Sequence, residues 1–195
     1  SESINGLIII SIQSGTMNNL SYIIACKKTR EALVIDPSGK VDVIHQEALK
    51  RGLTIRTIVN THSHWDHTDG NASLKSLTGA DIVMHTLAEE RLKQADRTVN
   101  DGDTIQAGEI RLKVIHTPGH TPGGICLYTR GQLFTGDTLF VGDSGRTDLE
   151  GSDRPTLGAS IRRLMQLPGD TVVRPGHNIG PKSTSTLNWE KLNPP

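Results

Sequence analysis

The stretch Thr61-His62-Ser63-His64-Trp65-Asp66-His67 decides how the rest of the chain is interpreted. Its three histidines and its aspartate can all bind a metal ion, and they follow a predicted strand, residues 57–60. If the chain stayed extended, the first two histidines and the aspartate would face one side and the last histidine the other. A turn after the second histidine would instead bring the aspartate and the last histidine round into a second cluster. Because closely packed imidazoles repel one another when protonated, this stretch favours a metal site over a polar surface turn.

Three further predicted strands are each followed by a metal-type side chain. These strands are residues 110–115, 132–135 and 171–174, and the side chains are His120, Asp137 and His177. Prolines and glycines on both sides of His120 favour a rigid backbone that can approach a bound group closely. His116 ends its strand and is interpreted as structural or as a residue that supports the metal ligands from behind, while His45 and His85 are interpreted as core or surface residues. Four strands that place such ligands at one end of the molecule indicate a metal centre.

The remaining sequence predicts two similar halves. Each half has short strands rich in β-branched residues, then a helix with apolar residues at helical spacing, then a strand that ends near a histidine. The predicted strands are residues 7–12, 21–25, 32–35, 57–60, 82–85, 104–105, 110–115, 124–128, 132–135 and 171–174, and the predicted helices are 41–51, 71–77, 87–94 and 156–167. This order predicts an α/β protein, a four-layer αββα sandwich of two mixed β-sheets, with residues 1–195 in one domain.

The composition excludes several classes of function. The 195 residues include 21 Lys+Arg and 21 Asp+Glu, so the formal net charge is zero, and only six residues are aromatic. Neither a basic surface nor a stacking platform for nucleic acid is expected. No apolar run reaches the ~20 residues that cross a bilayer, and the first residues do not resemble a secretory leader, so we expect a cytoplasmic protein without membrane contact. Cys26 and Cys126 lie in apolar stretches and are expected to be buried thiols, with a disulfide as the alternative. A homodimer through an outer helix is a further hypothesis.

The order of these motifs resembles that of the metallo-β-lactamase superfamily over nearly the whole chain. The resemblance implies one metal bound by His62, His64 and His120, a second bound by Asp66, His67 and His177, and Asp137 bridging the two. Seven ligands without a thiolate suit divalent ions such as zinc, with iron and manganese as alternatives. The resemblance also implies that a hydroxide bridging the ions would attack a substrate carbonyl. Asp66 would then be both a ligand and a catalytic proton acceptor.

Two branches of the superfamily fit the chain. His67 stands where secreted zinc β-lactamases often have arginine, and the neutral charge argues against the RNA-processing branches. Hydroxyacylglutathione hydrolases (glyoxalase II) share the seven-ligand set and hydrolyse a glutathione thioester. Persulfide dioxygenases share most of the motif order but use a single Fe(II), for which the resemblance implies His62, His120 and Asp137 as ligands.

The segment Gly145-Arg146-Thr147-Asp148 bears on the choice between them. Typical glyoxalase II has lysine and tyrosine after this glycine, whereas Gly-Arg-Thr-Asp resembles the persulfide dioxygenases and the short bacterial glyoxalase-II-like proteins. Arg146 is the candidate substrate-binding residue, since it could bind a carboxylate with two hydrogen bonds; an ion pair with Asp148 is the alternative.

The sequence therefore predicts a glyoxalase-II-like metallohydrolase of a small thioester or related acyl substrate. The second hypothesis is a mononuclear iron persulfide dioxygenase. The third is a metal-binding or sensor domain without catalysis.

Overall fold

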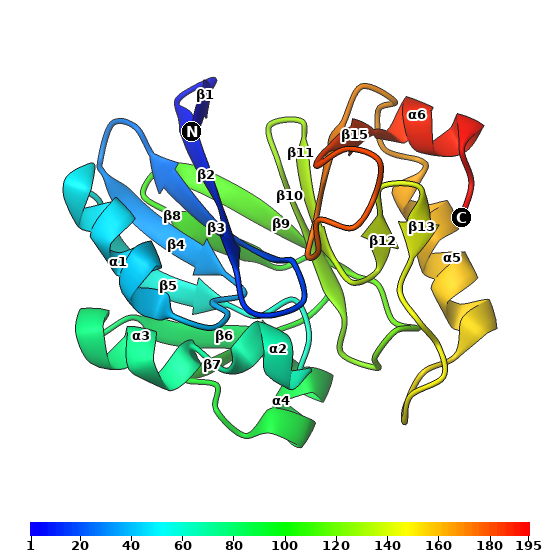
Figure 1. Cartoon of the computed structure of the whole chain (residues 1–195), viewed down its shortest axis with the longest axis horizontal. Helices are drawn as coiled ribbons and strands as arrows, with labels where there is room; N and C mark the ends of the chain where they lie inside the picture. Colours follow the sequence, from blue (N-terminus) through cyan, green and yellow to red (C-terminus); the bar gives the residue numbers. More distant parts are fainter.

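Two stacked β-sheets with helices on both outer faces form the architecture (Figure 1). The computed structural model describes residues 1–195. The first sheet has seven strands in chain order: β1 (Glu2–Ile4), β2 (Leu7–Ser14), β3 (Asn19–Cys26), β4 (Glu31–Ile35), β5 (Thr54–Val59), β6 (Asp81–His85) and β7 (Arg97–Val99). Strands β1 to β4 pair antiparallel, and β4 to β7 pair parallel.

The second sheet has six strands in the order β15-β14-β11-β10-β9-β8. These are β8 (Thr104–Ala107), β9 (Ile110–His116), β10 (Ile125–Thr129), β11 (Gln132–Gly136), β14 (Val172–Pro175) and β15 (Ser185–Thr186). Only β11 and β14 pair parallel, so both sheets are mixed. A small hairpin of β12 (Leu139–Phe140) and β13 (Asp143–Ser144) projects beside this sheet. The predicted sandwich of two mixed sheets is confirmed.

The helices cover the two outer faces. The first sheet is covered by α1 (Val41–Lys50), α3 (Asn71–Thr78) and α4 (Thr86–Leu92), with the short α2 (Trp65–Thr68) near one end, and the second by α5 (Arg154–Leu164) and α6 (Leu187–Leu192) (Figure 1). No helix is long and apolar enough to cross a bilayer. The cytoplasmic location, the homodimer and the one-domain organisation stay predictions.

Alternating side chains divide the apolar residues among three cores. In β3, Tyr22 and Ile24 face the second sheet and join the central core of 19 buried residues, whereas Ile23 faces the helices. This period of two is what a strand buried on both faces requires. Tyr22 and Phe134 meet edge to face across the two sheets, with ring centroids 5.2 Å apart. The Tyr22 hydroxyl donates to the Pro175 carbonyl at 2.6 Å, which ties the sheets together near the end of β14.

The structure differs from the sequence-based expectation in several places. The chain does not stay extended after His64: it enters α2, which is the turn that we considered as the alternative. Helix α5 begins two residues earlier than predicted, because the Asp153 carboxylate accepts the Thr156 N–H and caps it. The short elements β1, β7, β12, β13, β15 and α6 were not predicted. Cys26 and Cys126 are both buried free thiols, as expected.

Candidate metal centre

All seven predicted metal-binding side chains meet at one edge of the sandwich. They lie in the segments that follow β5, β9, β11 and β14. They form two groups, and within each group the donor atoms all lie within 4.8 Å of one another. One group is His62, His64 and His120, and the other is Asp66, His67, Asp137 and His177. The turn into α2 brings about this division, because it carries Asp66 and His67 away from the first two histidines.

Three imidazoles converge in the first group. His64 Nδ1 lies 3.1 Å from His120 Nε2, and the His62 ring lies 4.9 and 5.1 Å from these two rings, centroid to centroid. His62 Nε2 is buried and has no hydrogen-bond partner. A buried polar atom without a partner is costly unless something binds it. The geometry therefore points the three nitrogens at one common position.

Two carboxylates and two imidazoles form the second group. His67 Nε2 lies 3.0 Å from His177 Nε2 and 3.1 Å from Asp137 Oδ1. Asp66 Oδ2 lies 3.3 Å from His67 Nε2 and 3.4 Å from His177 Nε2. Asp137 also reaches the first group, since its Oδ2 lies 3.5 Å from His120 Nε2. Asp137 thus lies between the two groups, where a bridging ligand would have to be.

Backbone carbonyls fix the protonation of two of these rings. His177 Nδ1 lies 2.8 Å from the Met17 carbonyl oxygen, and His120 Nδ1 lies 2.8 Å from that of Arg146. A carbonyl only accepts hydrogen bonds, so both Nδ1 atoms carry the hydrogen. Each Nε2 then presents its lone pair to the centre, as a metal-binding histidine does.

A buried aspartate, Asp36, fixes two more rings. Its Oδ2 accepts from His67 Nδ1 at 2.9 Å and from the Thr61 hydroxyl at 2.6 Å, and its Oδ1 accepts from the Thr61 N–H at 2.8 Å. Because the only hydroxyl hydrogen of Thr61 is directed at Asp36, the Thr61 oxygen accepts from His62 Nδ1, 3.0 Å away. One carboxylate thereby turns the Nε2 lone pairs of both histidines toward the centre.

The electrostatics of the centre are those of a site that attracts a cation. Burial disfavours the charged form of His62 and lowers its pKa well below the ordinary value, and its histidine neighbours lower it further. Burial opposes ionisation of Asp137 as well, but the nearby histidines hold its pKa well below the ordinary range. For His67 burial is outweighed by the Asp137 carboxylate, which raises its pKa well above the ordinary value. The carboxylates thus remain negative and attract positive charge.

The residues fit a pair of divalent metal ions. His67 Nε2 and His177 Nε2 lie 3.0 Å apart, and because both Nδ1 atoms donate to acceptors, Nε2 carries a lone pair whenever the ring is neutral. Two facing lone pairs are unfavourable unless a cation or a proton lies between them. Nitrogen and carboxylate donors without thiolate suit zinc, iron or manganese. The buried cluster therefore suits a dinuclear metal site.

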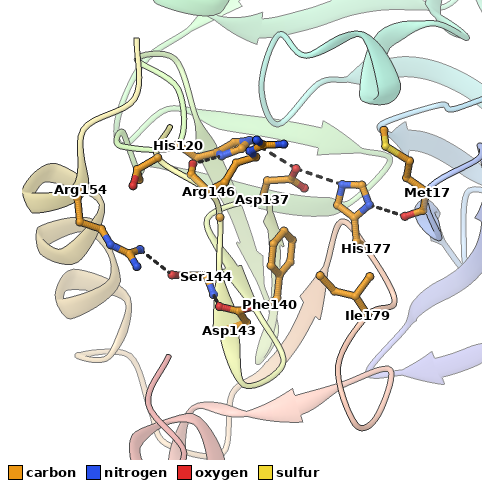
Figure 2. Close-up of a pocket in the computed structure, with 12 residues that line it drawn as sticks. Met17, His120, Asp137, Phe140, Asp143, Ser144, Arg146, Arg154, His177 and Ile179 are labelled. Carbon is orange, nitrogen blue, oxygen red and sulfur yellow. Dashed lines mark hydrogen bonds and ion pairs between the residues drawn. The ribbon is translucent and has the colours of Figure 1, made fainter. Parts of the chain in front are cut away.

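A cleft of about 530 Å³ opens beside the centre, lined by His120, Asp137 and His177 at its inner end (Figure 2). Arg146 lines the same cleft, but its guanidinium donates to both carboxylate oxygens of Asp148 at 2.6 and 2.7 Å. Of the two alternatives open for Arg146, the structure shows the ion pair. Its backbone carbonyl contributes to the centre by orienting His120.

Sequence reasoning missed the groups that orient the ligands. Asp36, which follows the predicted strand 32–35, and Asn19, whose side-chain amide donates to Asp66 Oδ2 at 3.1 Å, are not among the predicted site residues. A polar residue directly after a buried strand, as Asp36 is after β4, was the available signal. Of the histidines assigned no metal, His116 is structural as expected, since its Nε2 donates to the Pro122 carbonyl at 2.8 Å.

The comparison with known protein families agrees with this geometry. The Metallo-beta-lactamase superfamily matches residues 15–177, which include all seven side chains. The chain therefore belongs to the metallo-β-lactamase superfamily.

Enzymes of two different kinds are among its relatives. A protein named hydroxyacylglutathione hydrolase from Rhodospirillum rubrum is 41% identical over 179 residues, which cover 90% of this chain and 69% of that protein. The mitochondrial persulfide dioxygenase ETHE1 of Homo sapiens is 36% identical over 180 residues, which cover 89% of this chain and 70% of that protein. The crystal structure of ETHE1 from Myxococcus xanthus matches with a TM-score of 0.90 at 31% identity, covering 96% of this chain and 83% of that one.

Proposed function

We propose that the protein is a metal-dependent hydrolase of a small thioester or related acyl substrate, similar to glyoxalase II. Two divalent ions, with zinc as the first candidate, would be bound by the two groups of ligands, and Asp137 would contact both. When bound, such a pair of ions supplies a water of lowered pKa and polarises the substrate carbonyl. The tasks of positioning and proton transfer are left to the chain itself.

The observation that carries this proposal is the second group of ligands. A mononuclear site of two histidines and one carboxylate needs only His62, His120 and Asp137. Here Asp66, His67 and His177 are also buried and converge on one position. These three side chains, which would otherwise be costly to bury, are explained together by a second ion.

The chain's own residues would hold the metal ligands in position at the inner end of the cleft. The Phe140 ring packs edge-on against the His177 ring, with centroids 5.6 Å apart, and so restricts that ring. Burial raises the pKa of Asp66, but the His67 ring and the Asn19 amide outweigh it and hold this pKa well below the ordinary value. Asp66 is therefore ionised at neutral pH, which favours its role as a ligand. If Asp66 is also the proton acceptor, the proton must be transferred to a carboxylate that is a weak base, because its pKa is lowered.

A second candidate function is a persulfide dioxygenase with one Fe(II). It is supported by the TM-score of 0.90 with the Myxococcus xanthus protein and by the identity to the human dioxygenase. This candidate would use His62, His120 and Asp137 and leave the second group without a metal.

The test compares both reactions on one preparation. The protein is loaded anaerobically with zinc, manganese or Fe(II), and each sample is assayed for release of thiol from S-lactoylglutathione and for oxygen uptake with glutathione persulfide. We expect thioester hydrolysis that follows the metal content. Oxygen uptake confined to the iron sample, without hydrolysis in any sample, would establish the dioxygenase instead. Absence of both reactions in all samples would support the non-catalytic hypothesis.

A further inference from the structure

The charges that line the cleft are almost all engaged. His120, Asp137 and His177 belong to the metal centre, and Arg146 is neutralised by Asp148 through two short hydrogen bonds. What remains at the outer end of the cleft is Arg154, at the start of α5, together with Asp143 of the β12–β13 hairpin (Figure 2).

Arg154 has no carboxylate partner. Its Nη1 donates to the neutral Ser144 hydroxyl at 3.3 Å, and no carboxylate oxygen lies within 4.0 Å of its guanidinium. Asp143, the other free charge, already accepts the Ser144 N–H at 2.8 Å through its Oδ1. Arg154 therefore keeps most of its five N–H donors available to a ligand. A guanidinium with unused donors that lines a cleft is suited to a carboxylate.

The opposite wall of the cleft is apolar. Met17, from the β2–β3 turn, and Ile179, which follows β14, are 43% and 53% exposed, and Phe140 lies near Ile179, beside the His177 ring (Figure 2). Large apolar side chains exposed on the wall of a cleft gain from contact with an apolar group of a ligand. The cleft thus offers a cationic wall and an apolar wall that both lead to the metal centre.

We propose that Arg154 is a specificity-determining residue that binds a carboxylate of the substrate while an apolar part contacts Met17, Phe140 and Ile179. The inference rests on the proposed function and narrows its substrate class to acyl thioesters that carry a carboxylate away from the reacting carbonyl. The negative charge of Asp143 opposes the binding of a carboxylate. Removing the charge of Asp143 and removing the charge of Arg154 should therefore change the preference for a carboxylate substrate in opposite directions.

The test uses acetyl thioesters of mercaptoacetate, mercaptopropanoate and mercaptobutanoate, each beside its neutral methyl ester. For the chain length that fits, the wild-type protein is expected to prefer the carboxylate about tenfold in kcat/KM, which corresponds to about 1.4 kcal/mol. Arg154→Gln should bring this ratio close to one, Arg154→Lys should keep part of it, and Asp143→Asn should raise it. The preference should shrink with added salt, because the ion pair is partly exposed. Arg162→Gln, an exposed arginine of the same helix outside the cleft, is the matched control and should keep the wild-type ratio.

A second readout does not depend on turnover. Binding of the unreactive S-methyl thioethers of the same carboxylates, measured by calorimetry, should weaken about tenfold in Arg154→Gln and should not weaken in Arg162→Gln. Equal kinetics and equal binding of carboxylate and ester in the wild-type protein would refute the role of Arg154 while leaving the hydrolase intact. Carboxylate-selective binding without hydrolysis of any thioester would refute the proposed function and leave the binding role standing.

Discussion

The substitution Asp36→Asn should remove the metal-binding lone pairs from the Nε2 atoms of His62 and His67, although neither histidine is itself changed. The carboxylate accepts three hydrogen bonds, from the Thr61 N–H, the Thr61 hydroxyl and His67 Nδ1. An amide keeps the shape but replaces one acceptor by a donor. If the new NH2 lies at the Oδ2 position, His67 Nδ1 must accept, and its hydrogen moves to Nε2. The Thr61 hydroxyl must also accept from the amide, so the hydroxyl hydrogen turns toward His62 Nδ1. His62 Nδ1 then accepts this hydrogen bond, and the ring hydrogen of His62 moves to Nε2 as well.

The opposite orientation of the amide is no better. Its NH2 would then face the Thr61 N–H, which is also a donor. Loss of an orienting partner typically costs about 10- to 100-fold in metal affinity. Since Asp36 orients both His62 and His67, we expect about 100-fold weaker binding, or about 3 kcal/mol.

The assay is a metal titration against a chelating dye, with circular dichroism of the metal-free protein to show that the fold is kept. Asp42→Asn on the exposed side of α1 replaces a carboxylate by an amide far from the centre and is the control. Metal affinity and turnover in Asp36→Asn equal to those of the control would refute the account of how the rings are oriented.

Three further outcomes are expected. Gly145→Ala should reduce metal affinity and turnover, because a Cβ there would lie 1.9 Å from the Asp137 carbonyl oxygen and the backbone would have to move. Acid should destabilise the protein through His85, because burial and the neighbouring His116 lower the pKa of this histidine to about 4. The contribution of neutral His85 to the free energy of unfolding is fully present above pH ~6.5. About 3 kcal/mol of it is lost as the pH falls toward 4. Chelation should lower the thermal unfolding midpoint, because the ions bind only the folded chain, and metal at about 100 times its Kd contributes ~2.7 kcal/mol.

Each of these outcomes has its own control. Gly158→Ala within α5 places its Cβ no closer than 3.3 Å to any neighbour and should leave the metal centre unchanged. His85→Gln should flatten the acid limb of the stability curve measured by urea unfolding, relative to the curve of the wild-type protein. An unfolding midpoint that is insensitive to chelation, or an acid limb unchanged in His85→Gln, would contradict the corresponding argument.

Several of the ligands could be found from the sequence because they follow a strand closely. His62, Asp137 and His177 come one to three residues after β5, β11 and β14, so predicting the strands was enough to place these side chains at one edge. The short runs of β-branched residues at 7–12 and 21–25, separated by turn residues, likewise predicted β2 and β3 before their partners were known. These are local signals, and they depend on neighbours in the chain.

The groups that orient the ligands depend on neighbours in space. The Met17 and Arg146 carbonyls belong to the backbone and carry no residue signature. Asp36 becomes important only because β4 lies next to β5 in the sheet, which brings Thr61 beside it. The length of α2, four residues, is below what periodicity detects, although it decides which group contains Asp66.

The number of metal ions bound per chain distinguishes a dinuclear centre from a mononuclear one. Protein purified without added metal, and then protein reconstituted with zinc, is analysed by mass spectrometry of the intact complex and by elemental analysis. We predict two ions per wild-type chain, and one per chain in Asp66→Ala and in His177→Ala, with turnover abolished in both variants. A single iron per wild-type chain, unchanged in both variants and accompanied by oxygen uptake on a persulfide, would contradict this prediction.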